Sequence, residues 1–332
     1  SPAIGGGPPG LIDSSGLGIA AFVAPAKLDP KQVLFDGATK NDVPALWNQW
    51  TRKQWQWDGN IRDVLARNLV AALGLVGLPD KMDITANVVV SEFIDNLPPA
   101  PYPFAMPDMA TVGRGRSVYE ANCIACHRED QRRGEAGELP VFDLGTDMNR
   151  AKVVRPVGYQ IIEKEIVACY QPADLRFRLG DEEFRPNQNV DGAALLIKRF
   201  TPETQGYVAP PLDGLWARAP YLHNGSVPTL RHLLVPSLRE QARTFVRGAI
   251  SCDTKNLGWS WEVDRLARLR PENPSARVFD ASQDGQSNTG HDQKSWTDTE
   301  GKVGPKGRAY RLAWDDAENL EVEALIAYLK TL

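Results

Sequence analysis

Two stretches in the first third of the chain carry apolar residues at helical spacing. Residues 61–74 place isoleucine, valine, leucine and alanine on one face, and residues 84–96 repeat the pattern ahead of two prolines. Because residues three and four positions apart share one side of an α-helix, the spacing predicts two amphipathic helices, the first ending at Gly74. Residues 1–45 are broken by glycine and proline and are predicted to be irregular.

The remainder of the chain alternates between shorter helical patterns and stretches without periodicity. The spacing predicts helices near residues 159–168 and 190–200 and a further helix within 315–332. Residues 98–107 hold five prolines and indicate a stiff connector. Residues 281–308 are polar and rich in glycine, which indicates long surface loops. The pattern as a whole therefore favours a mainly α fold with long loop insertions.

Composition and charge exclude two classes of partner. The 332 residues are 42% hydrophobic and 24% charged, with a formal net charge of −4, and basic residues are mixed with acidic ones. Without a basic stripe, nothing in the sequence points to nucleic acid. The longest apolar stretch, residues 17–26, is too short to span a bilayer, so no transmembrane segment is expected.

The sequence Cys123-Ile124-Ala125-Cys126-His127 carries the most specific chemistry in the chain. C-x-x-C-H is the attachment motif of a c-type haem: both thiols become thioethers on one porphyrin edge, and the adjacent histidine ligates the iron. Half a zinc site and a thioredoxin-like dithiol are the alternatives. A structural zinc site needs four ligands, the sequence has no second C-x-x-C, and a redox dithiol does not need the histidine. We therefore predict one covalent haem c, with His127 as iron ligand.

This prediction bears on localisation and on the other two cysteines. Bacteria attach c-type haem outside the cytoplasm, so we expect a periplasmic or secreted protein whose leader has been removed or which is part of a longer chain. The sequence starts Ser-Pro-Ala and shows no leader of its own. In an oxidising compartment, Cys169 and Cys252 are candidates for a disulfide, the alternative being two buried thiols.

The haem motif also suggests how the second half of the chain is organised. In cytochrome c architecture, the first and last helices of the domain cross through small and aromatic residues. Here residues 115–120 predict a short helix leading into the motif, and Gly115 and Tyr119 are candidates to contact Leu325, Tyr328 and Leu329. An ordinary terminal amphipathic helix is the alternative. We expect two regions: an N-terminal irregular and helical segment, 1–108, and a cytochrome c-like domain with one haem, 109–332.

The second axial ligand of the iron is less clear from residue type. Met106, Met109 and Met148 are the available thioethers, and Met148 follows the haem motif too closely to fit the usual order. His223 lies in a rigid loop between Pro220 and Gly225-Ser226, and Thr229 is placed to cap a short helix that contains His232. Residue type alone does not choose between the two histidines. His291, in a polar loop, either approaches the haem or is held by local hydrogen bonds.

An ordered set of short motifs makes the chain similar to a known family. It resembles di-haem c-type proteins related to rubber oxygenase and, more distantly, bacterial di-haem cytochrome c peroxidases. The stretch 219–230 carries the resemblance most clearly. The other matching motifs are Trp57-Asp58-Gly59-Asn60, Arg67-Asn68, Pro101-Tyr102-Pro103-Phe104, Gly145-Thr146-Asp147, Gly290-His291-Asp292 and the ending 326–332.

The resemblance implies a mainly helical fold with a bis-His haem, His127 being the proximal and His223 the distal ligand. In these relatives the haem nearer the C-terminus is commonly the electron-transfer centre, whereas the haem nearer the N-terminus carries the chemistry. This sequence departs from the pattern because it holds one C-x-x-C-H. We therefore expect a complementary haem-bearing chain or a branch without the catalytic haem. The tryptophan-rich stretch 47–57 would face that second haem, or it forms an ordinary aromatic core.

Three functions follow as hypotheses. The first is an electron-transfer cytochrome, or the electron-transfer part of a di-haem oxidoreductase, which works with a redox partner protein and needs only a saturated iron. The second is a haem-dependent oxygenase or peroxidase acting at this haem, which needs an open iron site, so whether the chain is itself an enzyme stays undecided. No catalytic residue can be assigned from sequence. The third is a haem-bearing binding subunit without an electron partner.

Overall fold

The structure is a computed structural model, and a part of the chain is described. The described residues are 39–62, 64–76, 83–131, 141–152, 158, 160, 177–179, 182–184, 206–248, 251–263, 266, 276–292, 311, 313–316 and 318–332. The α-helices in these segments are α3 (Val64–Val76), α4 (Ile84–Asn96), α5 (Met109–Asn122), α8 (Leu230–Leu234) and α11 (Leu320–Leu329). Short 3-10 helices are η1 (Gln49–Thr51), η3 (Arg150–Lys152), η4 (Leu215–Ala217) and η5 (Pro236–Leu238).

The described strands form small antiparallel pairs. β1 (Val141–Phe142) pairs with β4 (Tyr207–Val208), β2 (Phe177–Leu179) with β3 (Glu182–Phe184), β5 (Thr244–Arg247) with β8 (Arg277–Asp280), and β6 (Cys252–Asp253) with β7 (Gly258–Trp259). The longest register sets residues 244–247 against 277–280. The expected mainly α fold is therefore confirmed only in part, because these sheets were not predicted. Within the described residues, no helix has the length and apolar character needed to cross a membrane.

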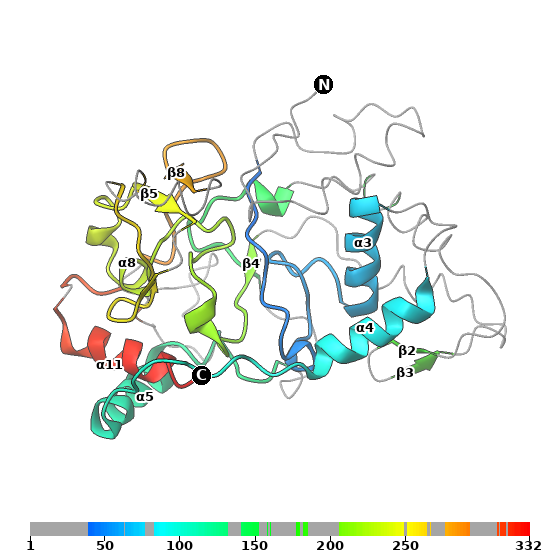
Figure 1. Ribbon diagram of the computed structural model, residues 1–332, viewed down its shortest axis with the longest axis horizontal. Coiled ribbons are helices and arrows are strands. Elements are labelled where there is room, and N and C mark those ends of the chain that lie inside the picture. The colour runs from blue at the N-terminus through cyan, green and yellow to red at the C-terminus, as the bar shows by residue number, and fades with distance from the viewer. Residues whose placement is uncertain are drawn as a thin grey trace.

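Helix α5 and helix α11 cross as predicted and form one end of the molecule (Figure 1). The Tyr119 and Tyr328 ring centroids lie 5.2 Å apart, and Leu325 and Leu329 are buried in the same apolar cluster. A Cβ atom at Gly115 would collide with the backbone carbonyl oxygen of Ala324, so glycine allows the two backbones to approach this closely. The two termini of the predicted haem domain are thereby packed together.

Helix α5 is longer than predicted, since it begins at Met109 rather than at Gly115. The Asp108 carboxylate caps it by accepting a hydrogen bond from the Thr111 backbone N–H at 2.9 Å. Apolar periodicity is weak over this first turn, and Met109 is 80% exposed. The cap rather than an apolar face therefore sets the start of the helix.

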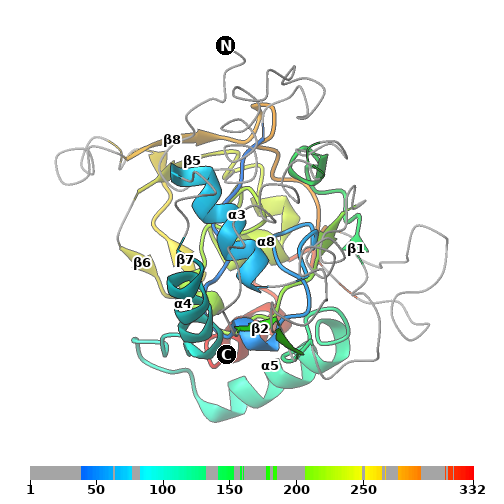
Figure 2. The same cartoon turned by 90° about the vertical axis from the view of Figure 1, so that its right-hand side faces the viewer.

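The helix pair α3 and α4 lies at the other end of the molecule, and Figure 2 shows the pair facing the viewer. The prediction for α4 is confirmed at both ends. Helix α3 continues through Gly74 to Val76, whereas the sequence suggested an end at Gly74. An interior glycine costs a helix about 1 kcal/mol, which is too little to force an end there. Asn68 donates a hydrogen bond to Ser91 Oγ at 2.7 Å and joins the two helices.

The segment between residue 39 and α3 connects the two ends. The Asp42 backbone N–H donates to the His223 carbonyl oxygen at 2.6 Å, and the Trp47 indole N–H donates to the Asp213 carbonyl oxygen at 2.8 Å. Residues 39–45 lack regular elements, as predicted, and so does the described part of the predicted loop 281–308, residues 281–292. The helices predicted at 159–168 and 190–200 lie outside the described residues, apart from residue 160.

Candidate haem site

The C-x-x-C-H motif begins where α5 ends. Cys123 is the C-terminal cap of the helix, and the chain then turns so that the Cys126 and His127 backbone N–H groups both donate to the Cys123 carbonyl oxygen, at 3.1 and 2.9 Å. This turn brings both sulfurs and the imidazole to one pocket. Burial raises the pKa of Cys123 to about 12 and that of Cys126 to about 11, so both are neutral thiols in the protein without haem.

His127 is oriented by a backbone acceptor. Its Nδ1 lies 2.8 Å from the Pro210 carbonyl oxygen, and that atom has no proton to give, so Nδ1 must be the donor. Burial lowers the pKa of His127 to about 4, which keeps the ring neutral. A neutral ring with the proton on Nδ1 leaves the Nε2 lone pair available as a metal ligand. The backbone of the motif is held in addition by the Tyr119 hydroxyl, which donates to the His127 carbonyl oxygen at 2.7 Å.

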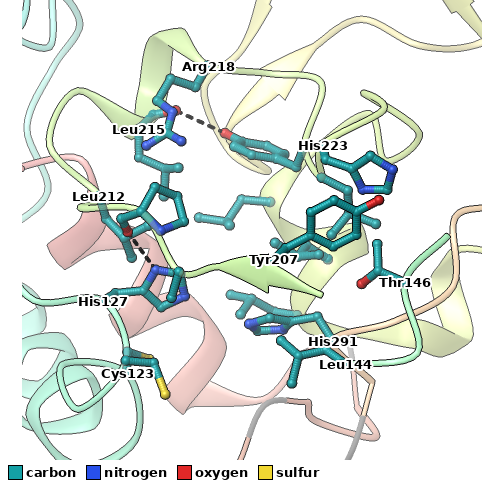
Figure 3. A pocket seen from close by; sticks show the side chains of 18 of the residues that line it. Cys123, His127, Leu144, Thr146, Tyr207, Leu212, Leu215, Arg218, His223 and His291 are labelled. Atoms are coloured by element: carbon teal, nitrogen blue, oxygen red, sulfur yellow. Dashed lines mark hydrogen bonds between the residues drawn. The ribbon is translucent and has the colours of Figure 1, made fainter. Parts of the chain in front are cut away.

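The pocket that receives these groups is mostly apolar. Its wall comes from the loop around β4 and η4, from α8 and from α11 (Figure 3). The apolar side chains of this wall include Leu144, Val208, Leu212, Leu215, Leu222, Leu230, Leu233, Leu234, Trp314, Leu325 and Leu329. Such a wall suits the flat, largely apolar face of a porphyrin, with both thiols at one edge.

His223 lies in this pocket and is almost fully buried, at 3% exposure. Its ring stacks on Tyr207, with centroids 4.2 Å apart and planes 16° apart (Figure 3). Neither ring nitrogen has a hydrogen-bond partner among the described residues. Burial, with a further contribution from the Arg150 charge, lowers the pKa of His223 to about 3. A neutral buried imidazole without a partner is a group that a ligand or metal would satisfy.

His291 also lines the pocket and lies nearer to His127. The two ring centroids are 6.4 Å apart, with the planes at 47° (Figure 3). The loop is held at this point, because the His291 backbone N–H donates to the Leu144 carbonyl oxygen at 3.1 Å and Gly290 packs against the Thr146 backbone. His291 itself has a positive φ of 57°, which is uncommon for a residue other than glycine.

The other sequence candidates lie outside the pocket lining. His232 packs edge-on against Trp261, and its Nδ1 lies 2.6 Å from the Thr229 hydroxyl oxygen. The same Thr229 caps α8, as predicted. Met106 is 50% exposed, and neither it nor Met109 or Met148 lines the pocket. Of the two histidines that residue type left open, the structure therefore brings only His223 to the haem motif.

The site also contains groups that the sequence did not single out. Tyr207 stacks on His223, the Pro210 carbonyl orients His127, and Arg218 lines the pocket while donating to the Pro211 carbonyl oxygen at 2.8 Å. The Ala-Pro-Pro run preceding Leu212 offers no side-chain signal, because the functional atom is a backbone oxygen. Cys169 lies outside the described residues, and the sulfur of Cys252 is a free thiol here. The proposed disulfide remains a prediction.

The residues present fit a haem. Two thiols adjoin one edge of an apolar pocket, a backbone acceptor fixes the tautomer that leaves Nε2 of His127 available, and two further imidazoles line the same pocket. This donor set would serve both covalent attachment and iron ligation of a haem.

Comparison with known proteins agrees with this geometry. Residues 206–244 match the family model described as RoxA-like, cytochrome c-like. The chain is 39% identical over 297 residues to the uncharacterized protein y4iM of Sinorhizobium fredii, covering 89% of this chain and 65% of that protein. It is 40% identical over 126 residues to the uncharacterized protein y4iJ of the same organism, covering 38% of this chain and 18% of that protein. The chain thus spans less than two thirds of each relative.

The family match spans β4, η4, the His223 loop, α8 and η5, and all of these except η5 contribute residues to the pocket lining. A cytochrome c-like domain implies haem c, in agreement with the C-x-x-C-H motif that lines the same pocket. The resemblance predicted from sequence is confirmed over this segment, which is similar to the RoxA-like, cytochrome c-like family model.

Proposed function

We propose that this protein transfers electrons through one covalently attached haem and acts as the electron-transfer part of a di-haem oxidoreductase. The observation that carries the proposal is the placement of His127 and a second imidazole on one pocket, so that the chain itself can fill both axial positions. Cys123 and Cys126 would hold the haem, and it would supply a one-electron iron couple. A saturated iron suits electron transfer and leaves no open position for oxygen or peroxide.

Two residues compete for the second axial position. The family resemblance favours His223, and its unpartnered buried nitrogens support that assignment. The separation between the His127 and His291 rings favours His291. The His127 and His291 ring centroids lie 6.4 Å apart, so both imidazoles would reach one iron held between them.

If His291 is the ligand, His223 has a different task. Its stack on Tyr207 and its burial would make it part of the pocket wall. Because Arg150 and burial disfavour the imidazolium form, His223 would remain a neutral hydrogen-bonding group there. The two assignments therefore differ in which substitution, His223→Ala or His291→Ala, would leave an open coordination position on the iron.

Low-temperature EPR of the ferric protein tests whether the iron is saturated and which histidine is its second ligand. The spectra are recorded for the unmodified chain, for His223→Ala and for His291→Ala. We expect a low-spin bis-imidazole signal that becomes high-spin in one variant, and that variant identifies the ligand. His232→Ala is the matched control, because His232 is buried outside the pocket, and it should keep the low-spin signal. A high-spin signal in the unmodified chain would refute the saturated iron and favour the second candidate, an oxygenase or peroxidase acting at this haem.

The protein would need a redox partner or a complementary haem-bearing chain. Helix α4 supports this, because Val89, Val90 and Phe93 are 60%, 49% and 65% exposed on one helix. Apolar side chains gathered on a helix face are typical of a surface that a partner covers. Residues 1–108, which contain this helix, would be the segment that packs toward the second haem domain. Haem attachment outside the cytoplasm would make the protein periplasmic or secreted.

A further inference from the structure

A second cavity lies beside the haem pocket and has chemistry that electron transfer does not use. Its volume is about 300 Å³, within the range of small-molecule sites. The segment 41–57, helix α3, Gln131 and residues 208–218 enclose it. Pro210 and Arg218 line both cavities, so the two share a wall on the side of the proximal histidine.

The charged side chains that line this cavity are all cationic. Among the described lining residues they are Arg52, Arg67 and Arg218, and no carboxylate joins them. Burial, with the like charges of Arg218 and Arg67, lowers the pKa of Arg52 to about 9, so its guanidinium is still charged at neutral pH. Asp213 and Asp95 offset part of this charge from outside the lining. Three guanidinium groups around a partly dry cavity produce a positive potential that favours an anion.

Hydrogen-bond donors in the cavity also lack acceptors. Nε and Nη2 of Arg67 and the indole Nε1 of Trp55 are buried without a hydrogen-bond partner among the described residues. Buried unpaired donors are unfavourable, and a carboxylate can accept several N–H groups at once. The unpaired N–H groups of Arg67 and Trp55 would therefore be satisfied by an acceptor-rich anion.

We propose that this cavity binds a carboxylate group, held by the Arg67 guanidinium and the Trp55 indole N–H. A guanidinium matches the two oxygens of a carboxylate in a bidentate pair. The indoles of Trp55 and Trp57, with Val43 and Leu46, suit the apolar body of an organic acid. The carboxylate has two sources: a free small organic acid, or a propionate of the haem in the neighbouring pocket.

Calorimetric titration of the purified haem protein with benzoate separates these sources. If the ligand is a free acid, benzoate binds saturably and Arg67→Met weakens it about tenfold or more. Arg67→Lys keeps the positive charge but cannot form the bidentate pair with a carboxylate, so this variant should retain part of the affinity for benzoate. Arg114→Met is the matched control, because Arg114 is an exposed arginine on α5, and it should leave binding unchanged. Circular dichroism confirms that each variant is folded.

If a haem propionate occupies the cavity, benzoate does not bind, and Arg67→Met shifts the propionate bands in the resonance Raman spectrum while Arg114→Met does not. If the variants are folded and the experiments show no benzoate binding and no Raman shift, the carboxylate site is overturned. The benzoate titration does not require haem, so a chain that fails to attach haem would refute the proposed function and still test this cavity.

Discussion

Substitution of Gly115 by alanine is the sharpest test of the helix crossing that supports the haem motif. A Cβ atom there would collide with the Ala324 carbonyl oxygen and lie 2.8 Å from Tyr328 Cβ. Because the main obstacle is backbone rather than a flexible side chain, α5 and α11 must move apart. Overpacking of this kind costs about 1–3 kcal/mol, and the rigid obstacle points to the upper end of that range.

Alanine also favours a helix over glycine by about 1 kcal/mol. We therefore expect Gly115→Ala to lower the free energy of unfolding by about 2 kcal/mol. Gly113 is the matched control, since it lies in the same helix and a Cβ atom there would meet nothing within 4 Å. Gly113→Ala should raise the free energy of unfolding by about 0.5–1 kcal/mol.

Urea unfolding followed by far-ultraviolet circular dichroism measures both variants on the same chain. The expected difference between them is about 3 kcal/mol, which corresponds to several degrees in Tm. Equal stabilities for the two variants would refute the close approach of α5 and α11 at Gly115. In that case the position of Cys123, at the end of α5, would need another support.

Two further predictions concern buried charge and pH. Arg150→Met should lower the free energy of unfolding by about 3–5 kcal/mol, measured by urea unfolding, because it leaves the Asp58 carboxylate, 3.3 Å from Arg150 and 1% exposed, without this cation. Arg116→Met, which breaks an exposed pair with Glu120, should change the stability far less. Burial lowers the pKa of His232 to about 4, so the unfolded chain binds more protons than the folded one between about pH 6.5 and 4. The stability contributed by neutral His232 is therefore lost as the pH falls through this window, and His232→Asn should show a shallower decline in Tm from pH 7 to 4.5; an unchanged slope would contradict the assignment.

The local signals in the sequence were enough for helix α4 and for the crossing of α5 and α11. Helix α4 follows its apolar spacing and ends ahead of Pro98, and the crossing of α5 and α11 was predicted from Gly115, Tyr119 and Tyr328. These predictions succeeded because spacing, capping and small residues act over a few neighbouring positions. The small sheets were missed, since strands of two to four residues leave too little alternation to recognise.

The choice of a second axial ligand is a different kind of question. His223 and His291 are 68 residues apart in the sequence, and nothing local reports their distances from His127. Similarly, Arg52, Arg67 and Arg218 come from three separate elements, and only their meeting at one cavity makes an anion site. Contacts between distant segments depend on how the whole chain packs, which single-sequence patterns do not encode.

The sequence by itself was enough to predict the cofactor chemistry, because the two thiols and the imidazole of C-x-x-C-H are set by five consecutive residues. The tertiary structure alone decided which proton His127 carries, since the Pro210 backbone oxygen that accepts it lies 83 residues away. It also decided which histidines approach that ring. Bond-forming groups are fixed by residue identity, whereas orientation, burial and charge are properties of the environment that the folded chain builds around them.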